Sequence, residues 1–177
     1  TLLIENGADI NAKDSYGLTA LMNAAVNGNL EVATLLIENG ADIAVKSPNN
    51  WAALSYAASK GNLEIATLLI ENGADIDVKA TYERTALMDA AANGNLEVAS
   101  FLIENGADID AKATDERTAL MNAAANGNLD VATRLIENGA DINAKSIYGS
   151  TALMQAAGNG NLEVATLLIE NGADINA

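Results

Sequence analysis

Carboxylates are the most numerous side chains in this sequence that could do chemistry, with 24 Asp and Glu residues against 9 Lys and Arg. Half of them recur at a constant spacing of 33 residues, as one Asp after each Gly-Ala and one Glu before each Asn-Gly-Ala. The two sets are Asp9, Asp42, Asp75, Asp108, Asp141 and Asp174, and Glu5, Glu38, Glu71, Glu104, Glu137 and Glu170. A pair of carboxylates in different environments can hydrolyse a glycoside. Equivalent copies do not form one such pair, so we expect no enzyme, and the aspartates also lack EF-hand spacing.

The side chains that several other catalytic mechanisms need are absent. The sequence contains no Cys and no His, which excludes thiol nucleophiles, Ser-His-Asp machinery and zinc sites built on Cys or His. We therefore predict a protein with no catalytic residues, no metal and no cofactor. No apolar run reaches membrane-spanning length and nothing resembles a signal peptide, so we expect an intracellular, cytoplasmic protein that does not contact a membrane.

Aromatic side chains and arginines are the remaining candidates for function. Five of the six aromatics lie where the 33-residue copies differ from one another, and two arginines accompany them. The seven residues are Trp51, Tyr56, Tyr82, Arg84, Tyr16, Arg117 and Tyr148. Trp, Tyr and Arg are enriched in the hot spots of protein interfaces. Because other copies hold Asn, Asp, Arg or Ser at these positions, we predict partner-binding residues, with Trp51 and Tyr56 as central anchors; tyrosines packed on the next loop are the alternative.

The period itself predicts how these residues are positioned. Gly-Ala-Asp-Ile recurs throughout, Thr-Ala-Leu-Met occurs four times, and the missing copy falls in register at Ala52. A fixed period of this size is typical of a solenoid, in which each unit packs on its neighbours. We divide residues 1–177 into one array, with a partial repeat at 1–13. Repeats 1 to 5 follow at 14–46, 47–79, 80–112, 113–145 and 146–177. Because the chain starts within a repeat and neither end resembles a capping unit, we expect it to be a segment of a longer protein.

Each repeat reads as two short helices and a loop. In repeat 1, Thr19 is expected to cap a helix that runs to Asn27, and Gly28 to end it in the left-handed conformation. Asn29 is expected to cap a second helix that runs to about Asn39. The polar stretch that follows lacks a helical period and is expected to form an extended, hairpin-like loop. The four methionines recur at helical core positions and are interpreted as core filler.

This pattern closely resembles the ankyrin repeat. The family motif Thr-Pro-Leu-His-x-Ala-Ala appears at residues 19–25 as Thr-Ala-Leu-Met-Asn-Ala-Ala, and Gly-Ala-Asp-Val-Asn appears at residues 7–11 as Gly-Ala-Asp-Ile-Asn. The resemblance implies an all-α repeat solenoid, a stack of antiparallel helix pairs with projecting β-hairpin loops, and partner binding in the concave groove. In the family the motif histidine hydrogen-bonds neighbouring loops. Methionine replaces it here, with Ser55 as the exception, so we expect apolar packing to join the repeats instead.

Repeat 2 departs most from the pattern. Ala52 replaces the helix-capping Thr, which typically costs about 1 kcal/mol. Asn50 replaces a turn glycine, Pro48 stiffens the loop, and Trp51 and Tyr56 occur in the same repeat. Local departures without local compensation often mark functional sites. We therefore place the centre of the binding surface here, with drift in one copy as the alternative.

The net charge of −15 argues against a nucleic-acid partner, whose phosphates would be repelled. The acidic residues either keep the array soluble or attract a basic partner. A lysine also recurs in each loop, at Lys13, Lys46, Lys79, Lys112 and Lys145. We expect these lysines to face neighbouring aspartates, with a basic stripe for an acidic ligand as the alternative.

Together these features predict a non-catalytic scaffold that binds a protein partner through the concave groove and the hairpin tips. Two alternatives remain: an engineered ankyrin-type binder, and a structural or self-assembling spacer. We expect a monomer, with head-to-tail stacking through the uncapped ends as the competing possibility.

Overall fold

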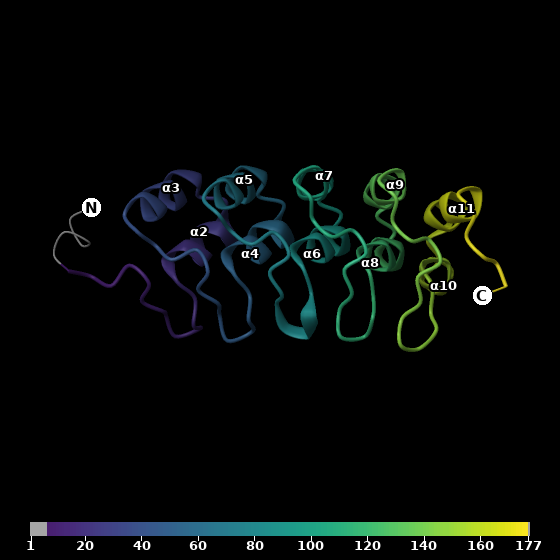
Figure 1. Cartoon of the computed structure of the whole chain (residues 1–177), viewed down its shortest axis with the longest axis horizontal. Helices are drawn as coiled ribbons and strands as arrows, with labels where there is room; N and C mark the ends of the chain where they lie inside the picture. The colour runs from purple at the N-terminus through teal and green to yellow at the C-terminus, as the bar shows by residue number, and fades with distance from the viewer. Residues whose placement is uncertain (1–6, 177) are drawn as a thin grey trace.

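The structure, a computed structural model, describes residues 7–176 as a single row of helix pairs (Figure 1). Residues 1–6 of the partial repeat, which include Glu5, lie outside the described residues. The first helices of the pairs, here called inner helices, are α2 (Ala20–Asn27), α4 (Ala53–Lys60), α6 (Ala86–Asn93), α8 (Ala119–Asn126) and α10 (Ala152–Asn159). The second, or outer, helices are α3 (Leu30–Glu38), α5 (Leu63–Glu71), α7 (Leu96–Glu104), α9 (Leu129–Glu137) and α11 (Leu162–Glu170). No strand forms between residues 7 and 176, which confirms the predicted all-α solenoid.

The ends of the inner helices follow the sequence. The Thr19 hydroxyl accepts a hydrogen bond from the Met22 amide at 3.3 Å, and Thr85, Thr118 and Thr151 form the same cap. Ala52 provides no side-chain cap, as predicted. Each inner helix then ends at a glycine such as Gly28, whose φ of 72° lies in the left-handed region that suits glycine.

Asparagines join each repeat to the one before it. The cap predicted for Asn29 is not formed, and the equivalent asparagines also leave their own helices uncapped. Asn62 Nδ2 instead donates to the Ala25 carbonyl at 2.6 Å. Asn95, Asn128 and Asn161 donate in the same way to Ala58, Ala91 and Ala124, at 2.7–2.8 Å. These acceptors lie in the last turn of an inner helix, where carbonyls lack a regular helical partner. The expectation that apolar packing alone joins the repeats is therefore wrong.

The inner helices pack through small side chains. Their paired alanines are completely buried in the middle of the row, at Ala57, Ala58, Ala90, Ala91, Ala123 and Ala124. Leucines of the outer helices, Leu69, Leu102, Leu135 and Leu168, are also completely buried. Met22, Met88 and Met121 fill the core as predicted, whereas Met154 at the end of the row is 43 % exposed. Ser55 takes the methionine position in repeat 2, and its buried hydroxyl has no hydrogen-bond partner among the described residues.

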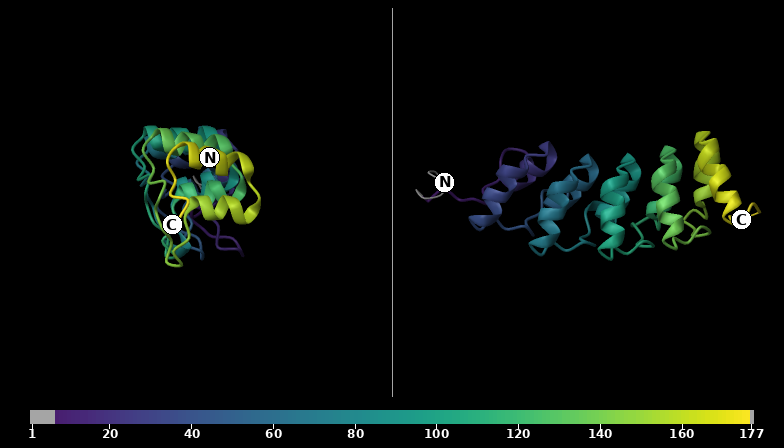
Figure 2. Two further views of the ribbon diagram at one scale, coloured as in Figure 1. Left: turned by 90° about the vertical axis from the view of Figure 1, so that its right-hand side faces the viewer. Right: turned by 90° about the horizontal axis from the view of Figure 1, so that it is seen from above.

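The loops between helix pairs all leave the row on the same side (Figures 1 and 2). We call residues 14–18, 47–51, 80–84, 113–117 and 146–150 the tip loops. One main-chain bond closes each of them, from the amide of the first residue to the carbonyl of the last, at 2.8–3.1 Å. The loops are thus closed as hairpins but form no strand, apart from a single 3₁₀ turn, η1 (Thr81–Glu83).

Main-chain bonds also join neighbouring tip loops, with one exception. The amides of Thr81, Thr114 and Ile147 donate to the loop of the preceding repeat at 2.8–3.1 Å. Pro48 occupies the equivalent position in repeat 2 and has no N–H to donate. It packs against Gly17, where an added Cβ would lie 2.5 Å from Pro48 Cδ. The tip loops of repeats 1 and 2 therefore meet through packing alone.

A polar ladder runs along the bases of the loops. The recurrent aspartates accept the amide two residues later, as Asp42 does from Ala44 at 2.8 Å. Lys13 and Lys46 donate to the carbonyls of Lys46 and Lys79, at 2.8 and 2.9 Å. The expectation that these lysines face aspartates is wrong for Lys13 and Lys46, which meet a main-chain carbonyl of the next repeat, and for Lys112, which pairs with Glu116 of the next tip loop.

The asparagine bonds predict a measurable contribution to stability. Asn95→Ala removes two donor contacts to repeat 2, so that the part-buried Ala58 carbonyl loses its bond from Asn95. The change should therefore lower the free energy of unfolding by roughly 1–3 kcal/mol. Urea denaturation followed by circular dichroism measures the change. Asn29→Ala is the matched control, because the exposed Asn29 side chain makes no hydrogen bond to another described residue. Equal effects of the two changes would contradict a role for the inter-repeat bond.

Candidate functional site

Trp51 and Tyr56 form the aromatic pair on the tip loop and inner helix of repeat 2. Their ring centroids lie 5.0 Å apart with the planes inclined by 50°, a separation at which aromatic pairs attract each other. The Tyr56 hydroxyl donates to Ser47 Oγ at 3.2 Å, and the Trp51 amide donates to the same oxygen at 3.2 Å. Both side chains are half-buried. The pair is therefore held in one geometry while part of each ring stays accessible.

The three other predicted tyrosines are the middle residues of their tip loops. Tyr16, Tyr82 and Tyr148 are 81 %, 73 % and 83 % exposed. The Tyr82 carbonyl accepts from the Thr114 amide at 2.8 Å, which ties its loop to the next repeat. None of the five predicted aromatics is enclosed in the core.

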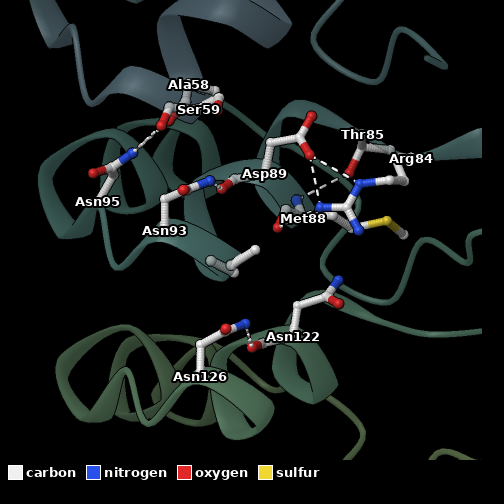
Figure 3. A network of polar contacts seen from close by, with 12 residues as sticks. Ala58, Ser59, Arg84, Thr85, Met88, Asp89, Asn93, Asn95, Asn122 and Asn126 are labelled. Atoms are coloured by element: carbon white, nitrogen blue, oxygen red, sulfur yellow. Dashed lines mark hydrogen bonds and ion pairs between the residues drawn. The ribbon is translucent and has the colours of Figure 1, made fainter. Parts of the chain in front are cut away.

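Arg84, predicted as a contact residue, forms an ion pair with the inner helix of its own repeat. Its Nε and Nη2 donate to the same carboxylate oxygen of Asp89, at 2.9 and 2.7 Å (Figure 3). Only 3 % of the Asp89 side chain is exposed, against 27 % of Arg84. The guanidinium charge is thus largely compensated inside the protein, because α6 carries an aspartate five residues after the arginine.

Because the predicted contact residues lie where the copies differ, the varying equivalents of Tyr56 on the other inner helices would be expected to face solvent too, at Asn23, Asp89, Asn122 and Gln155. Asp89 and Asn122 are instead buried, at 2 % and 4 % exposure, so they do not offer their side chains to solvent. A sequence signal for the buried pair existed in the arginine that precedes each helix-capping Thr of repeats 3 and 4. Its partner could not be assigned without knowing how the loop meets the helix.

Arg117 occupies the position of Arg84 one repeat later. It contributes to a cavity of about 320 Å³ between the tip loops of repeats 3, 4 and 5. Four of the seven predicted site residues lie together there, and the full lining is Tyr82, Arg84, Thr114, Asp115, Arg117, Ile147 and Tyr148. Trp51 and Tyr56 form a separate group in repeat 2, and Tyr16 lies at the tip of repeat 1.

The acidic side chains form no comparable site. The recurrent aspartates are engaged in their own turns, and no cluster of three or more Asp or Glu within residues 7–176 is arranged to hold a metal ion. Arg134, on the outer helix of repeat 4, forms an ion pair with Glu104 of the preceding repeat.

Comparison with protein families decides what this architecture is. The family model for ankyrin repeats matches three copies, over residues 1–80, 44–113 and 87–177, which together cover the chain. The chain belongs to the ankyrin-repeat family. A search of curated proteins returned no match.

Ankyrin repeats generally mediate protein–protein interactions, and the family is generally non-catalytic. In this ankyrin array the recurrent alanine pairs of the inner helices are buried and the asparagines before the outer helices bond to the preceding repeat, whereas the varying tyrosines of the tip loops are exposed. No helix between residues 7 and 176 has the length and apolar character needed to cross a bilayer.

Burial of Asp89 generates a prediction about pH. Loss of solvation raises the pKa of this carboxyl above 3.8, although the Arg84 charge and hydrogen bonds oppose the rise. A raised pKa means that the folded array binds this proton more tightly than the unfolded chain does. The contribution of Asp89 to the free energy of unfolding should therefore fall as the pH rises from 3.8 through the folded-state pKa.

The carboxyl carbon of Asp89, followed by NMR through a pH titration, should show a midpoint above 3.8. Urea denaturation over the same pH range should show that Asp89→Asn lacks this component of the wild-type pH dependence. A midpoint at or below 3.8 would mean that the ion pair with Arg84 outweighs burial.

Proposed function

We propose that this ankyrin array is a scaffold that binds a protein partner through its concave surface, formed by the inner helices and the tip loops. The Trp51–Tyr56 pair carries the proposal. Its rings are accessible in part and close enough to stabilise each other, while Ser47 Oγ accepts hydrogen bonds from the Tyr56 hydroxyl and from the main-chain amide of Trp51. A surface already held in its binding geometry loses little conformational entropy when a partner docks.

The surrounding residues support the same surface. Tyr16, Tyr82 and Tyr148 extend from the tip loops with most of their area exposed, and Arg117 lines the cavity between the last three loops. Arg84 lines the same cavity while its guanidinium is paired with Asp89. Neighbouring loops are joined by main-chain bonds from repeat 2 onwards, so the contact residues of repeats 2 to 5 keep their relative positions.

The double variant Trp51→Ala with Tyr56→Ala tests the anchors. It should weaken partner binding by roughly 2 kcal/mol or more, about 30-fold in Kd, because rigid aromatic side chains dominate interface energies. Affinity capture from cell lysate followed by mass spectrometry identifies bound proteins, and calorimetry then gives each Kd. Circular dichroism should show that the variant remains helical.

Glu64→Ala with Glu71→Ala is the control, because both residues are exposed on the outer helix of the same repeat. Partners captured by the wild type should be retained by this control and lost by the aromatic variant. Retention of every partner by the aromatic variant would place the binding surface elsewhere.

One observation favours the second candidate, head-to-tail self-assembly. The last repeat exposes apolar residues, with Met154, Ile169 and Leu162 at 43 %, 52 % and 72 %. In repeat 3 the equivalents of the first two, Met88 and Ile103, are 0 % and 9 % exposed. A following repeat would cover this face in a longer chain, and a second copy could cover it with the opposite face of its own first repeat.

We expect the array to remain monomeric, because its net charge of −15 makes copies repel one another. Light scattering at a series of protein concentrations should give one constant molar mass at low salt. A mass that rises with concentration would favour the spacer function over partner binding.

A further inference from the structure

In four of the five repeats, the inner helix bonds to its own tip loop through the side chain of its fourth residue. Asn23 donates to the Asp14 carboxylate at 3.2 Å, and Tyr56 donates to Ser47 Oγ at 3.2 Å. Asp89 accepts from Arg84 at 2.7 and 2.9 Å, and Gln155 donates to Ser150 Oγ at 2.8 Å. The residue types differ, but each pair satisfies the polar group that the loop presents to the helix.

Repeat 4 is the exception. Its fourth helical residue, Asn122, is 4 % exposed, and its Nδ2 has no hydrogen-bond partner among the described residues. The Nε of Arg117, in the tip loop of the same repeat, is also buried and lacks a partner there. Two buried donors therefore lie in one repeat at the place where the other repeats form a bond.

The defect leaves a positive charge uncompensated. Arg84 and Asp89 are five residues apart, as are Arg117 and Asn122, but asparagine carries no charge. The ion pairs within residues 7–176 join Arg84 to Asp89, Lys112 to Glu116 and Arg134 to Glu104, and none involves Arg117. Arg117 instead extends to repeat 5, where its Nη2 lies 3.4 Å from the neutral Gln155 Oε1.

The surroundings of Arg117 limit what could neutralise it. The cavity of about 320 Å³ at this point lies between Tyr82 of the preceding loop and Ile147 and Tyr148 of the following one. The carboxylate of Asp115 also lines it, but one of its oxygens accepts the main-chain amide of Arg117 at 3.2 Å. The cavity thus offers a half-buried guanidinium beside the aromatic and apolar side chains of Tyr82, Ile147 and Tyr148, with the polar residues Arg84, Thr114 and Asp115 in the same lining.

We propose that Arg117 binds the carboxylate of an Asp or Glu side chain carried by a peptide segment that docks between the tip loops of repeats 3, 4 and 5. The inference rests on the proposed function and names the chemistry of the partner. A guanidinium presents a planar fork of donors that matches a carboxylate. Partial burial strengthens the attraction, because the local dielectric is lower than that of water.

The charge of the whole array narrows the partner further. An array with a net charge of −15 repels a strongly acidic protein and attracts a basic one. The segment that fits is therefore one acidic residue flanked by neutral or basic residues. Asp115 in the cavity wall acts in the same direction, because a second carboxylate on the peptide would be repelled there.

Asn122→Asp is the sharpest test, because it reproduces in repeat 4 the arrangement of Arg84 and Asp89 in repeat 3. The new carboxylate should pair with Arg117, so that Arg117 no longer contributes to the affinity for an acidic peptide while the fold is kept. Arg117→Gln removes the charge directly and serves as the second variant if Asn122→Asp does not fold. Circular dichroism and thermal unfolding check the fold of both.

The probe is a library of random twelve-residue peptides displayed on phage with their C-termini fused to the coat protein, so that no free C-terminal carboxylate is present. Such a peptide is about 40 Å long when extended. That length suffices to reach from Trp51 to Arg117, two repeats apart, at about 10 Å per repeat. Peptides selected on the wild-type array are then synthesised with amidated C-termini for calorimetry.

We expect the selected peptides to share one Asp or Glu at a fixed position. Its replacement by Asn or Gln should weaken binding to the wild type by about tenfold or more, as loss of a charge-assisted hydrogen bond does. The same replacement should have little effect on binding to Asn122→Asp or Arg117→Gln.

Two results would overturn the proposal. Selected peptides that lack a shared acidic residue but lose affinity in the Trp51→Ala, Tyr56→Ala variant would leave the concave surface as the binding site and remove the role of Arg117. The role of Arg117 would also be removed if replacing the acidic residue of the peptide weakened its binding equally to the wild type and to both repeat 4 variants. Failure of every peptide to respond to the Trp51→Ala, Tyr56→Ala variant would instead count against the proposed function itself.

Discussion

The close approach of successive inner helices is the contact on which the rest of this molecule depends. Completely buried alanines allow the approach, and an asparagine from each following repeat bonds the last helical turn. A residue at this interface must fit the repeat on one side and the repeat on the other. Because every interior repeat meets the same requirement, the alanine pairs and the asparagines recur along the row, and the buried Ser55 in place of a methionine is a departure in repeat 2.

Much of the fold could be predicted from the sequence because its signals are local. The threonine caps, the left-handed glycines and the methionine positions lie within one repeat and act within one helical turn, and the structure confirms them. The errors have a common cause. Asn62 and Lys13 find their partners in another repeat, and a pattern read within one unit does not show which main-chain groups the neighbouring unit leaves unbonded.

The candidate binding residues could be predicted from the sequence less completely than the fold. Variation between copies identified the exposed tyrosines and the Trp51–Tyr56 pair, since a residue that the stack needs does not vary. The same criterion failed for Asp89 and Asn122, which vary and are nevertheless buried. Their burial depends on the arginine of the preceding loop, so the varying unit is a pair of residues and not a single position. The role of the seven predicted residues in binding stays a prediction.

The asparagine bonds that stabilise the row have a consequence for how it assembles. Asn95, Asn128 and Asn161 each find the same acceptor in the repeat before, so a nascent chain could satisfy the same bonds with one repeat skipped and looped out. Near-identical copies are interchangeable, and arrays of this kind are prone to such misassembly. Repeat 2 is the copy that is not interchangeable, because Pro48 fits against Gly17 and Ser55 replaces a methionine. Its irregular residues would therefore disfavour packing in which repeat 2 takes the place of another copy, and so favour the correct order of the repeats.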